Sequence, residues 1–324
     1  MTEDIKIPLL NVSVTDIEHQ GKDIVLITLT DTNGDALPEI KAGAHIDIHL
    51  DDDLIRQYSL CHDPCDNRSY RIGVLKDQAS RGGSIAIHQL QVGDKISISP
   101  PKNLFSLVDE ATHSILIGGG IGITPIVSMG YSLANEERSF EIHYCSRDRE
   151  TSAFITELES EPFNKAYYAH FKAQGGNHRE SLPPIFKEHA DNSHTHIYVC
   201  GPEPFMNWVI SEAEQAGFQP SNIHKEYFQV DLEKSGESFE VVAQKSGVTI
   251  QVGADESIVE ALTRHNIKTT VSCEQGICGA CLCDVLEGTP DHRDLYLTDE
   301  EKGYNDLMAI CCSRAKTDRL VLDI

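Results

Sequence analysis

Residues 273–281 read Cys273-Glu274-Gln275-Gly276-Ile277-Cys278-Gly279-Ala280-Cys281, and two further cysteines follow at positions 311 and 312. Three thiols in a C-x4-C-x2-C spacing, with a fourth about 30 positions later, are typical of the ligands of a [2Fe–2S] cluster. The small residues between them allow tight turns and let backbone N–H groups approach the sulfur atoms. Zinc is the alternative metal, but four-cysteine zinc sites usually consist of two C-x2-C pairs. The stretch therefore predicts an iron–sulfur centre.

The sequence around these cysteines predicts a small α+β domain over residues 238–324. Paired strands come first, a helix is expected over 257–265, and a strand over 320–324 closes the domain after the cysteine-rich loop. The preceding segment DLEKSGES is polar and contains glycine, so residues 231–237 are predicted to be a linker.

Residues 106–230 show a different pattern of predicted elements. Short apolar strands are predicted at 114–117, 141–144 and 196–199, and helical stretches such as 206–216 alternate with them. This alternation favours a parallel sheet with crossover helices.

Two motifs stand at the ends of these predicted strands. The run Gly118-Gly119-Gly120-Ile121-Gly122-Ile123-Thr124-Pro125 joins a strand to a helix, an arrangement that favours binding of a pyrophosphate. Ile123 replaces the third glycine of the Rossmann fingerprint, which argues against an ordinary Rossmann dehydrogenase. Cys200-Gly201-Pro202 ends another strand at the carboxyl edge, where parallel sheets bind ligands. A buried strand-end thiol is the alternative role for Cys200.

Residues 1–105 read as short strands separated by turns, for example at 24–29, 44–50, 70–75 and 95–99, and favour a small antiparallel β-barrel. Arg56-Gln57-Tyr58-Ser59-Leu60 ends a predicted strand, and Arg81-Gly82-Gly83-Ser84 opens a helix predicted over 84–90. The arginines and glycines suit a phosphate group, and Tyr58 offers a flat face to a ring. Each motif alone would be an ordinary strand or turn, but together they predict a site for a ring and a phosphate.

Charge and composition narrow the class of protein. The 324 residues carry 27 basic and 51 acidic side chains, a net charge of −24, which disfavours binding to nucleic acid or anionic membranes. Residues 115–129 are interrupted by four glycines and a proline, so no membrane span is expected. Met1-Thr2-Glu3-Asp4 lacks the features of a secretory signal, and a cytoplasmic protein with reduced cysteines is expected.

The motifs RQYSL, RGGS, GGGIGITP, CGPEPF, SCEQGICGAC and CCSRA occur in this order. With them, the chain from about Ile7 to Ile324 resembles the phthalate dioxygenase reductase family, which includes vanillate demethylase and carnitine monooxygenase reductases. The resemblance implies an FMN-binding barrel over 1–105, an NADH-binding domain similar to ferredoxin reductases over 106–230, and a plant-type ferredoxin of β-grasp fold over 238–324. It also implies delivery of electrons to a Rieske-type oxygenase. A monomer is expected.

The resemblance also implies roles for individual residues. The FMN site would comprise Arg56, Gln57, Tyr58, Ser59, Lys76, Arg81, Gly82, Gly83 and Ser84, with Gln57 in place of a threonine of some relatives. The nicotinamide site would comprise Gly119, Gly120, Gly122, Thr124, Pro125, Cys200, Gly201 and Pro202. Phe228 matches an aromatic residue that covers the flavin, although a core aromatic is the other interpretation. Ser59, Cys200 and Phe228 are therefore the expected catalytic set.

The family pattern also selects the fourth cluster ligand. The ligand precedes a one-residue spacer and Ser-Arg, so Cys311 is predicted to join Cys273, Cys278 and Cys281. Cys312 and Cys283 are then expected to be small buried side chains. His292 matches a recurrent DHRD segment of the family and is interpreted as structural.

The predicted combination of sites is that of an electron-transfer enzyme. NADH gives up two electrons as a hydride, a [2Fe–2S] cluster accepts one, and a flavin can do both. Two alternatives are a stand-alone NADH-dependent flavin reductase or oxidase, which would not need the cluster, and a non-catalytic redox sensor, which would need a readout surface. Arg147 and Arg149 could hold the 2′-phosphate of NADPH, but Asp148 and Glu150 flank them, so NADH is expected to be preferred.

Overall fold

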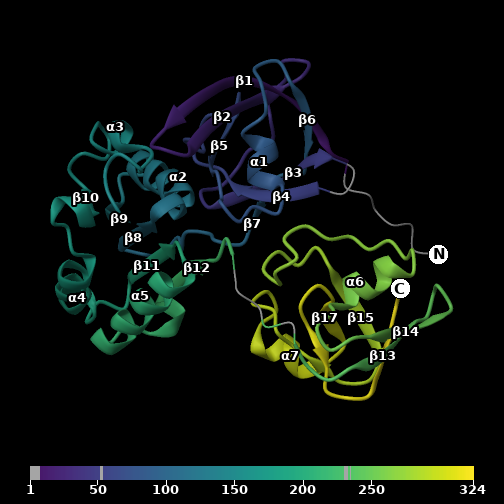
Figure 1. Ribbon diagram of the computed structural model, residues 1–324. Coiled ribbons are helices and arrows are strands. Elements are labelled where there is room, and N and C mark those ends of the chain that lie inside the picture. Colours follow the sequence, from purple (N-terminus) through teal and green to yellow (C-terminus); the bar gives the residue numbers. More distant parts are fainter. Residues whose placement is uncertain (1–7, 52–53, 230–232, 234) are drawn as a thin grey trace. The chain divides into compact units, whose positions relative to one another are not determined.

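The computed structural model describes residues 8–51, 54–229, 233 and 235–324. The chain divides into two compact units, residues 1–228 and 229–324 (Figure 1). Of the predicted linker 231–237, residues 231, 232 and 234 lie outside the described residues. No helix among the described residues is both long and apolar enough to cross a membrane.

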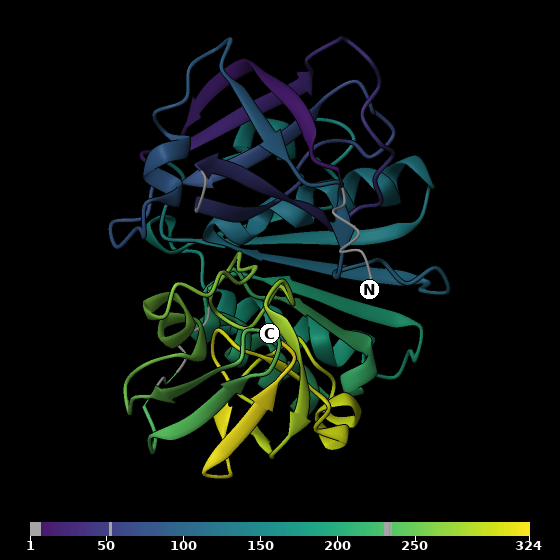
Figure 2. The same ribbon diagram turned by 90° about the vertical axis from the view of Figure 1, so that its right-hand side faces the viewer.

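The first unit begins with a seven-stranded antiparallel sheet, whose purple and blue strands wrap around a shared interior in Figure 2. Its strands are β1 (Leu10–Gln20), β2 (Ile24–Asp31), β3 (Ala44–Asp51), β4 (Leu54–Ser59), β5 (Tyr70–Leu75), β6 (Lys95–Ile98) and β7 (Lys102–Asn103). The order is β4-β3-β6-β1-β2-β5, with β7 on β3. The four strands predicted from the sequence lie in β2, β3, β5 and β6.

This strand path has two ends, and among the described residues it does not close into a continuous ring. A single isolated bridge between Leu60 and Ile72 links the end at β4 with the end at β5. The helix predicted over 84–90 is shorter than expected: α1 spans Gly83–Ile87. It ends early because the chain turns at once toward β6, where the Asp94 carboxylate accepts a hydrogen bond from the Gln91 N–H.

The second part of the first unit is a five-stranded parallel sheet in the order β10-β9-β8-β11-β12. The strands are β8 (His113–Gly119), β9 (Ser139–Ser146), β10 (Tyr167–Phe171), β11 (Thr195–Cys200) and β12 (Ile223–Glu226). The helices are α2 (Ile123–Asn135), α3 (Ile155–Leu158), α4 (His178–His189) and α5 (Glu203–Ala216). Helix α5 begins earlier than the predicted residue 206, with Pro202 at the N-cap and Pro204 in the first turn, where proline is well tolerated.

Alternation along β8 explains why helices cover both faces of this sheet (Figure 1). Leu116 belongs to the core that contains α2, whereas Ile115 and Ile117 belong to the core that contains α4 and α5. Successive side chains of a strand point to opposite faces, so a strand buried on both sides must be apolar throughout. The core with α2 also includes Ile24 and Leu26 of β2, so one face of the antiparallel sheet packs against α2, while its other face has a core of its own.

The second unit contains a mixed five-stranded sheet in the order β14-β13-β19-β15-β17 and the small pair β16–β18. The strands are β13 (Phe239–Ala243), β14 (Val248–Val252), β15 (Leu282–Glu287), β16 (Pro290–Asp291), β17 (Leu307–Ala309), β18 (Arg314–Ala315) and β19 (Arg319–Leu322). Helix α6 (Ile258–Arg264) starts with a capping box between Ser257 and Glu260, as expected for a helix predicted over 257–265. Helix α7 (Asp299–Tyr304) starts with a second capping box.

Candidate functional site

The four predicted cluster ligands lie together in the second unit, and each is at most 8% exposed. Cys273 hydrogen-bonds with Cys278, and Cys281 with Cys311, while the charge of Cys273 also acts on Cys281 and Cys311. The bond to Cys278 lowers the pKa of the Cys273 thiol to about 6, against the effect of burial. The bonds to their partners, together with burial, raise the pKa of the Cys278 and Cys281 thiols. These hydrogen bonds and charge effects among the thiols show that the sulfur atoms of the four cysteines lie close together.

The loop backbone surrounds these sulfur atoms. The Gln275 N–H donates to Cys273 Sγ at 3.3 Å, and the Ala280 N–H donates to Cys278 Sγ at 3.5 Å. Gly276 and Gly279 have φ values of 68° and 69°, which favour glycine. A Cβ at Gly276 would lie 2.6 Å from Cys312 Sγ, and one at Gly279 would overlap the Tyr296 ring. The loop is thus shaped for backbone N–H groups to face thiolates, the environment of a [2Fe–2S] cluster.

The two extra cysteines occupy different positions. Cys312 is 2% exposed, and its thiol lies against Gly276 and hydrogen-bonds with Cys311. The Cys283 thiol faces the Asp284 carbonyl oxygen at 3.5 Å, and burial raises its pKa to about 11. His292 is interior to its domain and lies 3.7 Å from the Asp294 carboxylate.

In the first unit, Arg56 joins the two motifs predicted to hold a flavin. Its Nη2 donates to the Arg81 carbonyl oxygen at 2.9 Å. Its side chain also packs on Gly83 so closely that a Cβ there would overlap it. Gly82 precedes α1 with φ 94°, a conformation that favours glycine. Two segments 25 positions apart therefore form one cradle of guanidinium and backbone, which suits a phosphate.

The remaining predicted flavin residues differ in how closely they join this cradle. Tyr58 shares a face of β4 with Arg56 and is half-buried, and burial raises its pKa to about 12. The Ser84 hydroxyl accepts from the Asp77 N–H at 3.1 Å. The Gln57 side chain instead contacts Asp47 on β3, where Gln57 Nε2 lies 3.5 Å from Asp47 Oδ1. The Lys76 side chain is exposed.

The other end of β4 reaches a glutamate that was not predicted as a site residue. The Ser59 hydroxyl donates to Glu226 Oε2 at 3.0 Å, although 167 positions separate the two residues. His45 Nδ1 lies 3.9 Å from the other carboxylate oxygen, and both ring nitrogens of His45 are buried without a hydrogen-bond partner among the described residues. The Glu226 side chain is 14% exposed.

The protonation of this group follows from its burial. Burial raises the pKa of Glu226 to about 7, although the bond from Ser59 opposes the shift. Burial, and then the charge of Glu226, raise the pKa of the Cys200 thiol well above its ordinary value. Near neutral pH, Glu226 can therefore hold a proton next to Ser59, and Cys200 remains a neutral thiol.

The predicted nicotinamide motifs meet at the carboxyl edge of the parallel sheet. Cys200 pairs with Gly118 between neighbouring strands β11 and β8. A Cβ at Gly122 would overlap the Cys200 carbonyl group, and one at Gly201 would lie 3.0 Å from Gly119 Cα. Gly120 has φ 57° and open space around its Cα. Both loops thus require glycine because they pack closely on each other, and the open space at Gly120 leaves room for a dinucleotide to approach.

Thr124 connects this edge to the antiparallel sheet. It is buried in the first turn of α2 together with Pro125, and its hydroxyl donates to the Ile121 carbonyl oxygen at 3.1 Å. A Cβ at Gly73 of β5 would lie 2.8 Å from its methyl group. Phe228 is partly buried against the same core.

Comparison with known proteins gives two matching family models. Residues 241–316 match the 2Fe-2S iron-sulfur cluster binding domain, and residues 116–210 match the oxidoreductase NAD-binding domain. Vanillate O-demethylase oxidoreductase of Pseudomonas sp. (strain HR199 / DSM 7063) is 43% identical over 319 residues, which cover 98% of this chain and 100% of the relative.

Two solved structures extend the comparison. Phthalate dioxygenase reductase, described as a modular structure for electron transfer from pyridine nucleotides to [2Fe-2S], is 34% identical with a TM-score of 0.75 and 98% coverage of both chains. An intact type IV self-sufficient cytochrome P450 monooxygenase is 37% identical with a TM-score of 0.82, and the match covers 98% of this chain and 41% of that one. The chain belongs to the phthalate dioxygenase reductase family.

As a member of this family, the protein is an oxidoreductase with an NAD-binding domain and a [2Fe–2S] cluster binding domain. The residues present can hold these groups. The cysteine thiols converge in the second unit, and the first unit contains both the Arg56–Gly83 cradle, which suits a phosphate, and the glycine-rich carboxyl edge of the parallel sheet, which suits a dinucleotide. Sequence analysis missed Glu226 and His45 as site residues. Glu226 is the last residue of β12, and the rule that ligands bind at the carboxyl ends of parallel strands was the signal that could have found it.

Proposed function

We propose that this reductase takes electrons from NADH at the Ser59–Glu226–Cys200 group and delivers them singly, through its ferredoxin domain, to a Rieske-type terminal oxygenase. Bound FMN would accept hydride from NADH and release electrons one at a time to the cluster. The observation that carries the proposal is the 3.0 Å bond between Ser59 and Glu226, which joins the predicted flavin strand to the carboxyl edge of the nicotinamide sheet.

Each predicted site residue then has a physical task. Arg56, Arg81 and the Gly82–Ser84 backbone would hold the FMN phosphate, while Tyr58 would support the ring. Gly119, Gly120, Gly122 and Gly201 would admit the pyrophosphate of NADH. Cys200 and Thr124 would shape the pocket for the nicotinamide. Phe228 would cover the ring until the nicotinamide displaces it.

Ser59 and Glu226 would hold and supply the proton that accompanies reduction of the flavin. With a pKa of about 7, Glu226 can hold a proton beside the Ser59 hydroxyl, and the two residues would be able to supply a proton to a flavin ring bound next to them. A neutral carboxyl also avoids placing a negative charge beside a ring that gains electrons. No stronger acid or base is required, because the cofactors supply the redox chemistry.

We propose three functional modules, an FMN module over 1–105, an NADH module over 106–230 and a ferredoxin module over 238–324. The bridge between Leu60 and Ile72 supports description of the first sheet as a barrel that binds FMN. None of the ten cysteines, all of them among the described residues, forms a disulfide, which suits the reducing cytoplasm. We expect a monomer.

Cys273, Cys278, Cys281 and Cys311 are the proposed cluster ligands. Pairing of Cys281 with Cys311 favours Cys311 over Cys312 as the fourth. The Arg149 guanidinium is engaged by Glu159, with Nη2 2.6 Å from Oε2, which leaves it less available to a 2′-phosphate and supports a preference for NADH. A ratio of kcat/KM that favours NADPH would reject this preference.

The decisive experiment couples the purified reductase, with NADH, to a purified Rieske-type oxygenase under anaerobic conditions. Reduction of the oxygenase Rieske centre supports the proposal. Reduction of free flavin or oxygen alone would instead indicate the stand-alone flavin reductase. A haem monooxygenase is the second candidate acceptor, because the P450 monooxygenase above contains a segment similar to this whole chain. Reduction of a P450 haem but not of the Rieske centre would favour it.

A further inference from the structure

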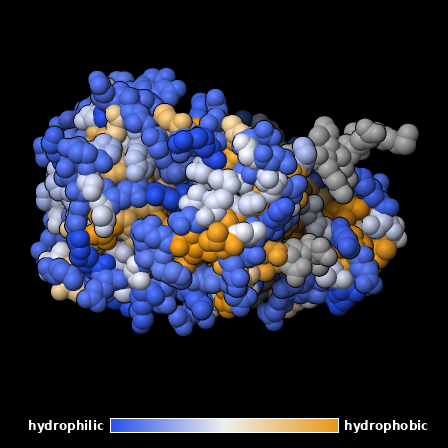
Figure 3. All heavy atoms as spheres, turned by 90° about the horizontal axis from the view of Figure 1, so that it is seen from above, coloured by the Kyte–Doolittle hydropathy of each residue, from blue (hydrophilic) through white to orange (hydrophobic). Residues whose placement is uncertain are grey.

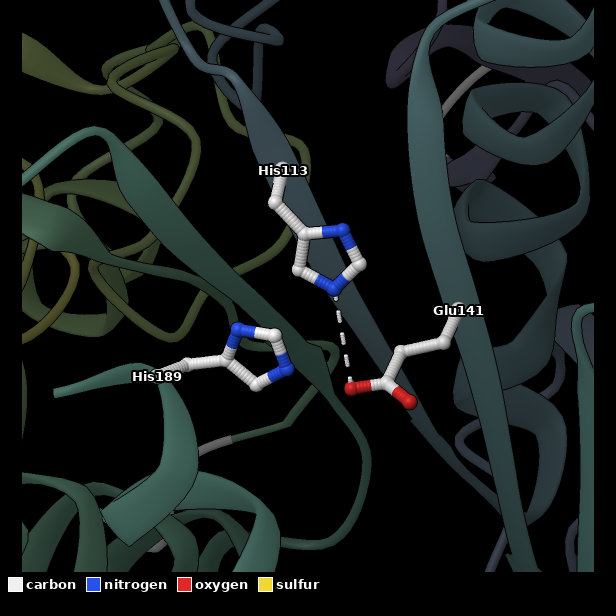
Figure 4. Close-up of side chains that lie close together, drawn as sticks. All are labelled: His113, Glu141 and His189. Carbon is white, nitrogen blue, oxygen red and sulfur yellow. Dashed lines mark ion pairs between the residues drawn. The ribbon is translucent and has the colours of Figure 1, made fainter. Parts of the chain in front are cut away.

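A group of histidines and one glutamate lies at the amino-terminal edge of the parallel sheet. His113 begins β8, Glu141 lies near the start of β9, and His189 ends α4 (Figure 4). One ligand atom from each of the three lies within 4.8 Å of the others, and all three residues are partly buried. The site is separate from the nicotinamide edge, because the six steps of extended chain from His113 to Gly119 span about 20 Å.

Two buried polar atoms in this group face each other. His113 Nε2 lies 3.7 Å from Glu141 Oε1, and neither atom has a hydrogen-bond partner among the described residues. Buried polar atoms are almost always satisfied. A proton or a cation between His113 Nε2 and Glu141 Oε1 would therefore satisfy both atoms.

Neighbouring side chains hold His113 and Glu141 in the way that metal ligands are usually held. The His113 Nδ1 lies 2.8 Å from Ser139 Oγ, which leaves Nε2 directed at Glu141. On the other side, Glu141 Oε2 lies 3.3 Å from His143 Nε2, and His143 Nδ1 lies 3.0 Å from His170 Nε2. Metal-binding histidines usually have their second nitrogen held in this way.

We propose that His113, Glu141 and His189 form a binding site for a divalent transition-metal ion, with Zn²⁺ as the natural occupant. Two imidazoles and one carboxylate are a donor set that suits zinc, and three protein ligands leave a fourth position for water. The ion would connect the end of α4 to β8 and β9, so its role is to stabilise the NADH module rather than to take part in electron transfer.

Binding requires one local adjustment. The rings of His113 and His189 are stacked with centroids 4.6 Å apart and planes at 11°. One ion cannot lie in the planes of two parallel rings, so the His189 ring must rotate about its side-chain bonds. His189 is the last residue of α4, and its ring is only partly buried.

The test is equilibrium dialysis of the untagged, full-length holoprotein against Zn²⁺, with zinc and iron measured together. We expect saturable binding of one zinc per chain, without loss of iron, and a higher thermal midpoint with zinc. His113→Gln and His189→Gln should each weaken zinc binding by about 10-fold or more. His265→Gln, which changes an exposed histidine of the other unit, is the matched control and should bind zinc as the wild type does.

Both variants should keep the flavin spectrum and NADH-driven flavin reduction of the wild type, which shows that they fold. No saturable zinc binding by the wild type would overturn the proposal. Equal zinc binding by the wild type and both variants would overturn it as well.

Discussion

The two units of this molecule build their sites in opposite ways. In the ferredoxin unit, three of the four converging thiols belong to the single loop 273–281. In the flavin and nicotinamide unit, Ser59 and Glu226 meet although they are 167 positions apart. A site within one loop depends on local backbone geometry and on a few thiols. A site assembled from strand ends depends on the fold of the whole unit, and many contacts each contribute a part of its binding and activity.

This difference predicts how each site fails. Removal of one thiolate leaves a cluster without a full ligand set, so the loss should be complete. Removal of one contact from the assembled site should reduce binding or rate by a limited factor. The face shown in Figure 3 is mostly hydrophilic, with several hydrophobic patches.

The largest expected effect is loss of the cluster in Cys311→Ser. Iron and cluster absorbance should disappear, while FMN content and NADH-driven flavin reduction stay normal, because the ligands and the flavin site lie in different units. Iron analysis and absorbance spectra measure this. The control is Cys312→Ser, which should retain iron. If Cys312→Ser loses iron and Cys311→Ser keeps it, the ligand assignment is wrong by one residue.

A smaller effect is expected at the phosphate cradle. Arg56→Ala removes a charged donor from FMN and a packing partner from Gly83. Hydrogen bonds to charged groups contribute about 1.5–3 kcal/mol, so the Kd for FMN should rise roughly 10–100-fold. Fluorescence titration of the apoprotein with FMN measures it. Arg68→Ala, at a side chain that is 86% exposed, is the control, and an equal loss in both variants would contradict the cradle.

The same contrast explains what could be predicted from the sequence. The cysteine spacing was sufficient to locate the cluster loop, and the glycine run before α2 was sufficient to locate a nucleotide edge. The two motifs taken together already predicted that Arg56 and the Gly82–Gly83 turn form one phosphate site. The bond between Ser59 and Glu226 depends on how β4 and β12 are brought together, which no local pattern encodes. The predicted length of α1 was wrong because the chain after Ile87 forms a turn, in which the Gln91 N–H donates to the Asp94 carboxylate.

A pH-dependent effect is expected at Glu226. Its native pKa of about 7 lies above the ordinary 4.5, so the residue is protonated below pH 7 and ionised above it. The rate of flavin reduction by NADH should therefore fall as pH rises through about 7 in the wild type. Glu226→Gln should give a flat profile between pH 6 and 8 in stopped-flow measurements. The same break in both proteins would show that Glu226 is not responsible.

Stability should follow the same titration. Because the native state binds this proton more tightly than the unfolded state, the wild type should lose stability as pH rises from 4.5 to about 7. The loss should be roughly 3 kcal/mol at most, and Glu226→Gln should lack it. Urea unfolding of the two proteins at several pH values measures the difference.

The smallest effect is expected at the proposed docking surface. Residues 237–324 carry 16 acidic and 8 basic side chains, a net charge of −8, which favours a basic patch on the oxygenase. Glu274 lies within the cluster loop and is half-buried. Glu274→Lys should slow electron delivery to the oxygenase by a few-fold at low salt and less at high salt. Glu287→Lys makes the same charge change at an exposed strand position, and equal rates for both variants and the wild type would reject electrostatic docking at the loop.

The most direct test of the electron path is anaerobic reduction of FMN-depleted protein by NADH. If the flavin is the obligatory link between the two units, the cluster should remain oxidised when NADH is added, and addition of FMN should restore its reduction. Stopped-flow absorbance and electron paramagnetic resonance of the cluster report both steps. Rapid reduction of the cluster by NADH without FMN would contradict the account.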